Sequence, residues 1–497
     1  NYVEKINAGA KFFTNPNGSV QILENGSITE FVNDDVGNTT SQTDPKANPT
    51  STLFDNLNRP TTITDALSNN TVYTYNVADQ LAEVTAPNNV KTTYEYDDLG
   101  NQTKEISADR GTSTYVHDDA GNVVTSTNGK NVTSTYTYDA LNRLTSISLS
   151  DGSVSSTFEY DSGPNAIGRM NQQTSLSNNP ISNAYANVVD TYTYDGFGNI
   201  ETHNSDVQIG TSSSFVACVP SGAGCSTTSY QYDKQNRITQ MTYPDGMVIN
   251  YQRDAVGRIE SIDTAHDGKT YDLVKDRAYR ADGLLTSQTN INDTEVSQWF
   301  DLQGRMDYAN QTLSSHVEQW SYAYDANGNV EQADRDAKLY NYEYDVLDRL
   351  DGEKGYKRIL YGTQDLESEF SLLYDANGNR ETFDEAYPND NVDTYNYDDD
   401  PLNNRLTDIN GAAITYDAMG SMLTKPNQVF TYDGIGRLVG FNESGASRTD
   451  YVYDASNRRV AKVGGVQGTD IQATYHYDIQ SRLIAEYDDQ GTLITAY

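Results

Sequence analysis

The chain alternates tyrosine with polar residues in short runs, and each run is followed by turn-forming residues and then by an apolar residue. The stretch from Tyr136 to Leu144, Tyr-Thr-Tyr-Asp-Ala-Leu-Asn-Arg-Leu, has the pattern in full. Tyr136 and Tyr138 are two positions apart, so an extended strand places both rings on one face. Asp139 begins a four-residue turn, and Leu144 starts the next strand. The pattern therefore predicts a β-hairpin.

This hairpin pattern recurs from one end of the chain to the other. The steps from Asp97 to Asp118 and from Asp118 to Asp139 are 21 residues each, which suits two short strands and two turns per repeat. Copies in the first sixty residues are degenerate, with Phe31 and Phe54 where tyrosine is usual. Clear copies place tyrosine before aspartate at Tyr96, Tyr138, Tyr160, Tyr194, Tyr232, Tyr324, Tyr344, Tyr374, Tyr397, Tyr416, Tyr432, Tyr453 and Tyr477.

The residue types at the turn have physical reasons. We expect the turn Asp to accept hydrogen bonds from the backbone N–H groups two and three residues on. Gly or Asn follows three places after it, because these residues tolerate a positive φ. Asp348 and Ser481 take that place in two copies, where we expect strain or a different turn. An Arg in the next position can reach the turn Asp or lie on a tyrosine ring. The residues assigned to the structural repeat include Tyr136, Tyr138, Asp139, Asn142, Arg143, Tyr194, Asp195, Gly198, Tyr432, Asp433, Gly436 and Arg437.

The predicted fold class is all-β. One hairpin cannot bury its apolar side alone, but about twenty side by side form one long antiparallel sheet with ladders of tyrosine rings. Such a sheet twists, and curling into a spiral, hollow shell or barrel hides one face and leaves few free edges. Residues 1–60 are read as degenerate repeats and 61–497 as the repeat sheet, with no internal domain boundary.

Two stretches break the rhythm, near residues 162–190 and 202–229. Both are predicted to be long surface loops. The second holds the two cysteines of the chain, Cys218 and Cys225, in the run Cys-Val-Pro-Ser-Gly-Ala-Gly-Cys. Their spacing predicts a local disulfide and an oxidising compartment, with two free thiols as the alternative.

Composition narrows the classes of partner. The net charge of −37 argues against nucleic acid and anionic lipid, which both need clustered Lys and Arg. No stretch approaches the roughly 20 apolar residues of a membrane helix, so we expect no membrane insertion. The hydrophobic fraction is only 36%, and 38 tyrosines must supply much of the buried area.

The unit Tyr-x-Tyr-Asp-x-x-Gly/Asn-Arg/Asn-Leu/Ile resembles the repeat of the YD-repeat, or Rhs-repeat, family over residues from about 30 to 497. The ending from Arg482 to Asp488 resembles the segment that leads into the Rhs-associated core. The resemblance implies a sheet wound into a hollow shell, secreted or borne on a bacterial surface. In toxin complexes and Rhs effectors such a shell encloses a carboxy-terminal toxin, whereas in teneurin-like surface proteins a similar barrel serves cell–cell contact.

The chain departs from the toxin-bearing members of that family. It stops at Tyr497, before any core domain or toxin. Self-cleavage in those members needs an Asp-Pro followed closely by Gly. The Asp-Pro pairs here, Asp44-Pro45 and Asp400-Pro401, lack that context. Self-cleavage and toxin activity are therefore not carried over.

No residue pattern points to catalysis or to a bound cofactor. The five histidines lie outside any zinc or nucleophile–base motif, so we expect no enzyme. The alternation of oxygen side chains around a Gly is typical of the start of a calcium loop, although the distal Glu is missing and a plain β-turn is the other interpretation. The residues concerned are Asp325, Asn327, Asn329, Asp375, Asn377 and Asn379.

Two functions follow from the sequence. The first is a non-enzymatic secreted or surface shell that wraps and shields or delivers a polypeptide, toxin-like cargo. The second is a structural or adhesive extracellular protein without cargo, whose aromatic sheet contacts neighbouring copies or surface glycans.

Overall fold

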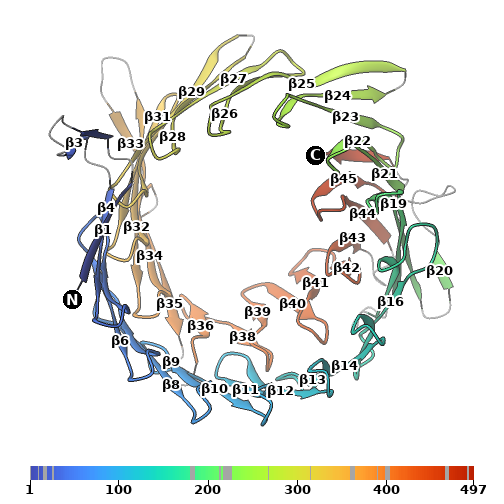
Figure 1. Cartoon of the computed structure of the whole chain (residues 1–497), viewed down its shortest axis with the longest axis horizontal. Coiled ribbons are helices and arrows are strands. Elements are labelled where there is room, and N and C mark those ends of the chain that lie inside the picture. Colours follow the sequence, from blue (N-terminus) through green and yellow to red (C-terminus); the bar gives the residue numbers. More distant parts are fainter. Residues whose placement is uncertain are drawn as a thin grey trace. The chain divides into compact units, whose positions relative to one another are not determined.

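The computed structural model describes residues 2–8, 11–14, 20–24, 27–178, 185–211, 214–216, 227–266, 268–313, 315–358, 364–388, 390–397, 403–464, 470–489 and 492–497. Over these ranges the chain consists of strands, turns and bends, and no helix occurs in them. In the same ranges no helix is long and apolar enough to cross a membrane. Figure 1 labels the strands along the chain.

The strands are short and follow one another closely. The first are β1 (Tyr2–Ala8), β2 (Lys11–Thr14), β3 (Val20–Glu24), β4 (Ser27–Asn33), β5 (Thr39–Thr43), β6 (Pro49–Phe54), β7 (Pro60–Thr64), β8 (Asn70–Tyr75), β9 (Leu81–Thr85), β10 (Lys91–Tyr96), β11 (Gln102–Ser107), β12 (Gly111–His117), β13 (Val123–Thr127), β14 (Thr133–Tyr138), β15 (Leu144–Leu149) and β16 (Val154–Tyr160). Next come β17 (Met170–Asn178), β18 (Tyr185–Tyr194), β19 (Ile200–Thr211), β20 (Ser214–Val216), β21 (Thr227–Tyr232), β22 (Ile238–Thr242), β23 (Val248–Arg253), β24 (Ile259–His266), β25 (Lys269–Tyr279), β26 (Leu285–Asn290), β27 (Glu295–Phe300), β28 (Met306–Thr312), β29 (Val317–Tyr324), β30 (Val330–Arg335) and β31 (Lys338–Tyr344). The last are β32 (Leu350–Arg358), β33 (Gln364–Tyr374), β34 (Arg380–Tyr387), β35 (Asn391–Tyr397), β36 (Leu406–Ile409), β37 (Ala412–Ala413), β38 (Thr415–Tyr416), β39 (Met422–Lys425), β40 (Gln428–Tyr432), β41 (Leu438–Glu443), β42 (Thr449–Tyr453), β43 (Arg459–Gly464), β44 (Asp470–Tyr477), β45 (Leu483–Tyr487) and β46 (Leu493–Ala496).

Nearly every strand pairs with its neighbour in sequence. Strands β1 and β4–β37 form a 35-stranded sheet, β38–β46 a nine-stranded one, and β2 pairs with β3. The described strand pairs are antiparallel, as between β14 and β15, where Tyr136 lies opposite Ile147. The predicted fold class, tandem antiparallel hairpins in one long sheet, is confirmed.

Each Tyr-Asp turn closes a hairpin around one carboxylate. In the Asp139 turn, Oδ1 accepts hydrogen bonds from the backbone N–H of Leu141 (2.8 Å) and of Arg143 (3.0 Å). The N–H three residues on, that of Asn142, bonds the carbonyl of Asp139 instead (3.0 Å). The expected acceptance from residues two and three on is therefore corrected to two and four on. Asn142 has φ 60°, which completes a turn of the type that ends in a left-handed residue.

A β-bulge accompanies the turn. Thr137 pairs with Ser146, but Tyr138 pairs with Leu144, so Thr145 is an extra residue on β15. The same register shift precedes Tyr194 and Tyr453 in their hairpins. A bulge bends its strand and raises the local twist, so each repeat adds twist at the same place.

The two atypical turns are ordinary. Asp348 has φ 60° and Ser481 has φ 61°, and their N–H groups bond the carbonyls of Asp345 (3.1 Å) and Asp478 (3.0 Å), as Asn142 does in its own turn. The expectation of a different turn was wrong, because the Asp carboxylate fixes the turn and a small polar residue accepts the left-handed conformation at a cost of roughly 1–2 kcal/mol.

Arginine joins one hairpin to the next. The guanidinium of Arg143 bonds Asp139 of its own turn (Nε–Oδ2 2.6 Å) and Asp161 of the following one (Nη2–Oδ2 2.6 Å). It also lies 4.4 Å from the ring centre of Tyr160, whose hydroxyl donates to the carbonyl of Leu144 (2.9 Å). The repeat tyrosines therefore meet guanidinium groups and backbone more than each other. Rings also contact rings, as in the stack of Tyr340 on Tyr342 and in the cross-strand pairs Trp299–Tyr308 and Phe430–Phe441.

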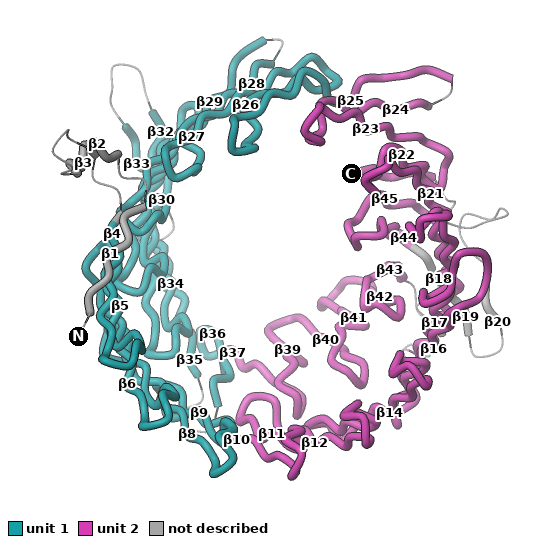
Figure 2. The backbone as a smooth tube through the Cα atoms, in the orientation of Figure 1, with its two compact units in different colours: residues 1–93, 274–411 teal, residues 94–273, 412–497 magenta. Residues whose placement is uncertain are grey.

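The chain forms two compact units, although we expected no internal division. Unit 1 comprises residues 1–93 and 274–411, and unit 2 comprises residues 94–273 and 412–497 (Figure 2). Each unit thus contains a first stretch and a second stretch that are far apart in sequence. Sequence periodicity could not reveal this division, because the repeat continues without change through each boundary.

The core of unit 2 lies between the faces of its two stretches. Val188 and Val207 from the first stretch pack with Val460 and Val463 from the second. A neighbouring cluster joins the two stretches in the same way and contains Tyr230, Met241, Tyr243, Ile249, Ile484, Ala485 and Tyr487. Fully burying one such aliphatic side chain contributes about 1.5–3 kcal/mol, so this face is the most strongly packed part of the described structure.

The stretches predicted as loops near 162–190 and 202–229 are largely strand in their described parts. Strands β17 and β18 pair in continuous register from Gln172–Thr191 to Asn178–Tyr185, and β19 continues to Thr211. The prediction was wrong because the buried face there mixes small or polar side chains, such as Ser175 and Ala186, with apolar ones such as Val188, so no regular apolar pattern marks the strands. Cys218 and Cys225, with their predicted disulfide, lie outside the described residues.

The turn carboxylates are not equivalent, and Asp433→Ala is expected to destabilise the protein more than Asp139→Ala. Asp433 is 2% exposed and pairs with the buried Arg437 (Nε–Oδ2 2.6 Å), so its loss leaves a buried charge unpaired, at about 3–5 kcal/mol. Arg143 is more exposed than Arg437 and keeps Asp161 when Asp139 is removed. Urea unfolding of both variants measures the difference. Equal losses would show that burial of the pair is irrelevant.

Candidate functional site

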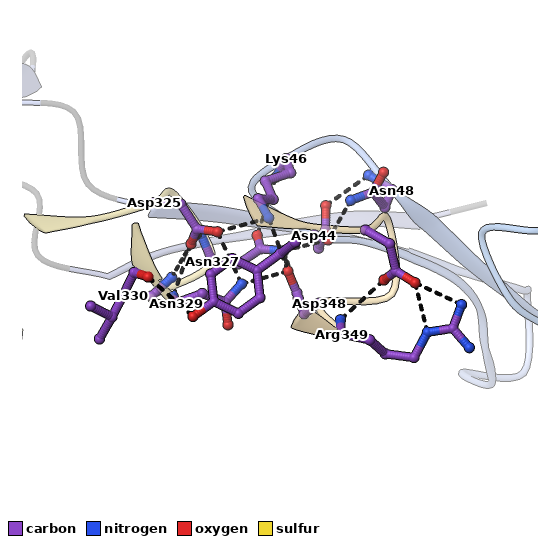
Figure 3. A network of polar contacts seen from close by, with 12 residues as sticks. Asp44, Lys46, Asn48, Asp325, Asn327, Asn329, Val330, Asp348 and Arg349 are labelled. Carbon is purple, nitrogen blue, oxygen red and sulfur yellow. Dashed lines mark hydrogen bonds and ion pairs between the residues drawn. The ribbon is translucent and has the colours of Figure 1, made fainter. Parts of the chain in front are cut away.

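In unit 1 the two stretches meet where a Tyr-Asp turn of the second touches a plain turn of the first. The turn Asp325–Asn329 lies against the turn Asp44–Asn48 (Figure 3). Lys46 is the centre of this contact. Its ammonium bonds the Asp325 carboxylate (2.7 Å) and the Asp348 carboxylate (3.1 Å).

Amide side chains complete the network around Lys46. The Asn327 Oδ1 accepts the backbone N–H of Lys46 (3.2 Å). The Asn327 Nδ2 donates to Asp44 (2.6 Å) and to Asp348 (2.8 Å). Burial alone would lower the pKa of Lys46, but its bonds to Asp325 and Asp348 raise that pKa above the ordinary value. The lysine therefore stays charged and neutralises carboxylates that would otherwise repel one another.

The calcium candidates are engaged with protein groups. Asp325 directs Oδ1 to its own turn and Oδ2 to Lys46 and to the Asn329 amide (2.9 Å). An ion at this place would have to displace Lys46. In the second candidate set, the Asp375 Oδ2 accepts the Asn379 amide (2.8 Å). Over the described residues no cluster of three or more His, Cys, Asp or Glu side chains is arranged to hold a metal.

The second candidate set marks another docked turn. The Asn377 Oδ1 accepts the backbone N–H of Asn88 (3.2 Å), as Asn327 does with Lys46. The amides of Asn377 and Asn88 both donate to the Asn404 Oδ1 (2.5 Å). The two Asp-Ala-Asn-Gly-Asn runs thus have the same role: the central Asn accepts a hydrogen bond from a backbone N–H of a turn in the other stretch.

Docking in both units has nearly the same separation in sequence. Lys46 and Asn327 are 281 residues apart, and Asn88 and Asn377 are 289 apart. In unit 2, Gly434 meets Ser153 at a separation of 281 and Asn128 at 306. Since a repeat occupies about 20 residues, the chain returns beside itself after roughly 14 repeats in either unit.

The turn position that docks also differs in chemistry from the same position elsewhere. It is Asn327 or Asn377 in the docked turns of unit 1. It is Leu57, Leu141 or Phe197 in turns of the first stretches, where the side chain is 60%, 70% and 86% exposed. Asn at this position therefore accompanies docking in two turns of unit 1, whereas the docked Asp433 turn of unit 2 has Ile435 there.

In unit 2 a buried polar cluster joins the faces of the two stretches. The Asp190 carboxylate contacts the His203 Nε2 (3.0 Å), the Gln173 Nε2 (2.8 Å) and the Arg458 Nη2 (3.6 Å). Gln173 also bonds the hydroxyl of Ser456 (3.0 Å) across the contact. Burial would raise the pKa of Asp190, but His203, Arg458 and Gln173 outweigh it and lower that pKa.

The same cluster contains a histidine, an aspartate and a serine, the residue types of an acid–base site, but they are not arranged as in such a site. His203 stacks on Tyr192 (ring centres 4.9 Å apart) and pairs with Asp190, as an oriented base would. The Ser456 hydroxyl, however, is held by Gln173 at 3.0–3.2 Å. Arg458 pairs with Asp454 (2.6 Å), whose pKa burial raises. These bonds suit a cluster that satisfies buried charges between two sheets.

The residues assigned to the repeat lie where the motif places them. Tyr194 donates to the carbonyl of Met170 (2.5 Å), and Asp195 accepts from the N–H of Phe197 (2.9 Å). Gly198 has φ 86°, and a Cβ there would lie 1.9 Å from the guanidinium of Arg169, so any other residue would have to displace this arginine. Lys46, Asp190, His203 and Arg458 were missed as site residues. A search for polar residues on the buried face of a strand would have found two of them, because Asp190 is two places from Tyr192 and His203 is paired with Tyr192 on the neighbouring strand.

Two family models match the chain. One, described as the Teneurin YD-shell, matches residues 356–497, and the other, the RHS Repeat, matches residues 75–112, 117–154, 226–248 and 232–270. Over these residues the chain is similar to the YD-repeat, or Rhs-repeat, family. The resemblance inferred from the tyrosine and aspartate pattern is thereby confirmed, over both the middle and the end of the chain.

Solved structures share the fold of this YD-repeat chain. The crystal structure of TcdB2-TccC3 without its hypervariable C-terminal region matches with a TM-score of 0.73 at 15% identity, covering 95% of this chain and 30% of that one. The Photorhabdus luminescens Tc holotoxin pore matches with a TM-score of 0.71 at 15% identity, covering 99% of this chain and 33% of that one. At this identity the likeness shows the fold alone.

A curated relative is the tRNA3(Ser)-specific nuclease WapA of Bacillus spizizenii. It is 25% identical over 249 residues, which are 50% of this chain and 8% of WapA. The YD-repeat chain thus spans about a third of the structures that it matches and a small part of this relative.

Replacing the docking Asn is expected to open the contact in unit 1. Asn327→Leu leaves Asp44, Asp348 and the N–H of Lys46 without their partner, which should lower the stability of this contact by about 1–3 kcal/mol. Hydrogen exchange of the Lys46 amide should accelerate accordingly. The matched control is Leu141→Asn in an exposed turn, which should change stability by less than about 0.5 kcal/mol. Unchanged Lys46 exchange in Asn327→Leu would contradict the docking role.

His476 should make unit 2 less stable at acidic pH. Burial, assisted by His203, lowers the pKa of His476 from 6.5 to about 4, so the unfolded chain binds the proton more readily. Stability should therefore fall as pH drops from about 6.5 to about 4, by roughly 3 kcal/mol in total. His476→Phe should remove this part of the pH dependence in urea unfolding, whereas His316→Asn at an exposed site should keep it. The same slope in His476→Phe as in the parent would refute the assignment.

Proposed function

We propose that this chain is a wall segment of a secreted or surface-borne YD-repeat shell that wraps and shields or delivers a polypeptide cargo. The observation that carries the proposal is the docking of turns 281–306 residues apart in both units. A strip whose successive passes lie beside each other makes a continuous wall. The likeness in fold to TcdB2-TccC3, over 95% of this chain, supports the same conclusion.

The chemistry of the described contacts suits a wall more than an active site. Buried charges are paired within each turn, as in Asp433–Arg437, or between stretches, as in Lys46–Asp325. The first kind of pair stabilises a hairpin turn, and the second holds the two stretches of a unit together. We propose that the chain itself is not an enzyme, and that the nuclease activity named for WapA belongs to other parts of that much longer protein.

The second candidate is a structural or adhesive extracellular protein without cargo. One observation favours it: the apolar turn residues Leu57, Leu141 and Phe197 are exposed at corresponding places of their repeats. Exposed apolar side chains suit contact with other proteins, including neighbouring copies. Surface glycans are the other partner proposed, through stacking on exposed aromatic rings such as Trp299.

Electron microscopy and proteolysis of the complete natural polypeptide separate the two functions. The shell predicts hollow particles and a carboxy-terminal segment that resists trypsin until the wall is opened by Asn327→Leu together with Asp433→Ala. Extended polymers, with every segment outside the repeats cut at the rate of a free peptide, would overturn the shell and favour the adhesive protein. Particles of the Leu141→Asn variant should remain closed, because that residue takes no part in docking.

A further inference from the structure

Unit 2 has a pocket of about 520 Å³ beside the turns that follow β21 and β23, where the turn that follows β44 comes near them. The pocket is lined by three arginines, Arg237, Arg253 and Arg482, and by no acidic residue. This is unusual in a chain whose net charge is −37. Three guanidinium groups around one pocket favour the binding of an anionic ligand.

Arg253 stands where the repeat has its second tyrosine. It follows Tyr251 and Gln252 and precedes Asp254, so it replaces the ring of the Tyr-x-Tyr-Asp unit. Its Nη2 donates to the carbonyl of Ile238 (3.2 Å), as the tyrosine hydroxyl does in other hairpins, and its Nη1 donates to the carbonyl of Gly257 (3.2 Å). The substitution keeps the structural bond and adds a positive charge.

That added charge is not neutralised within the described structure. The Nε of Arg253 is buried without a hydrogen-bond partner, and no described carboxylate forms an ion pair with this guanidinium. A buried donor without a partner costs about 1–3 kcal/mol, and more when it is charged. An anionic ligand beside Arg253 would supply both the acceptor and the counter-charge.

Arg237 and Arg482 leave donors available for the same ligand. Each is anchored by its own turn, through Asp233 (Nε–Oδ2 2.7 Å) and Asp478 (Nε–Oδ2 2.6 Å). Each guanidinium bonds its turn carboxylate through Nε and Nη2, so Nη1 of both side chains remains without a hydrogen-bond partner among the described residues. Anchored guanidinium groups lose little freedom on binding and match the fork of a carboxylate.

The rest of the wall is mainly apolar and aromatic, with three amide side chains, Asn199, Asn236 and Gln480. Tyr232, Tyr251 and Met241 contribute rings and a thioether beside the arginines. Such a wall adds no binding free energy for a small hydrated anion, but it can bury the apolar part of an organic acid. We propose that this pocket binds a polypeptide carboxylate, on an acidic or carboxy-terminal residue, together with an adjoining apolar side chain. The identification of the ligand as a polypeptide rests on the proposed function, whereas the preference for a carboxylate with an apolar body rests on the pocket alone.

The test uses hippurate, a carboxylate on an aromatic amide body, as the probe for the whole chain. Ligand-observed NMR should show saturable binding of hippurate and binding at least about tenfold weaker for its neutral amide, hippuramide. Arg253→Tyr restores the usual residue of the repeat and therefore keeps the hairpin, but it should weaken hippurate binding at least about tenfold, as should Arg482→Gln. Arg305→Gln changes the equivalent turn arginine in unit 1 and should leave binding unchanged.

The outcomes decide the proposal without reference to any cargo. Hippurate binding that survives both Arg253→Tyr and Arg482→Gln would overturn it, as would equal binding of hippuramide. Full displacement of hippurate by an equal concentration of inorganic phosphate would also overturn it, because the pocket would then select charge alone. Since the measurement needs only this chain and small molecules, its failure is distinct from failure of the shell, which is judged by particle shape and protection from trypsin.

Discussion

The rest of the structure depends on the aspartate of the Tyr-Asp turn, whose two carboxylate oxygens bind different groups. In turns such as those of Asp139, Asp233 and Asp478, Oδ1 of the aspartate holds the backbone of its own turn and Oδ2 holds the arginine four residues on. That side chain then reaches the following hairpin, where Arg143 meets Tyr160 and Asp161. A local turn is thereby converted into a link between neighbours. Because each link is made once per repeat, the strip is built from contacts of short range, and its stability is close to a sum of repeats and their junctions.

Contacts of long range need a departure from the repeat. In unit 1 the departure is Asn at a turn position that elsewhere holds an exposed apolar residue, together with Lys46 in the opposing turn. In unit 2 it is burial of a sheet face, where Asp190, His203 and Arg458 satisfy one another between apolar clusters. The pocket at Arg253 belongs to the same class, because one residue breaks the motif while the hairpin around it is kept. Positions that break a repeat are therefore where a repeat protein acquires binding and assembly.

Much of this could be predicted from sequence, and the remainder could not for identifiable reasons. The hairpins, the carboxylate of the turn and the left-handed residue followed from tyrosine spacing and from the chemistry of Asp, Asn and Gly. The strands β17–β19 did not, because buried polar residues such as Ser175 interrupt the apolar pattern of Val188 and Val207, and the burial of this face depends on a stretch about 280 residues away. Asp325 and Asn327 were noticed for their oxygen atoms, but the group that they bind, Lys46, lies in a turn with no motif of its own. Periodicity reveals the repeat, whereas the partner of each docked turn is a property of the folded chain.

The central claim is that stretches about 280 residues apart lie against each other within one unit, and site-directed cross-linking tests it directly. Gln173 and Ser456 bond at 3.0 Å across 283 residues, so cysteines placed at both positions, with Cys218 and Cys225 changed to serine, should be joined by a short bis-maleimide. The account predicts this cross-link by mass spectrometry in the native protein and its loss in urea. The paired strand positions Thr157 and Thr174 serve as the positive control. A native protein that joins cysteines at 157 and 174 but never at 173 and 456 would contradict the account.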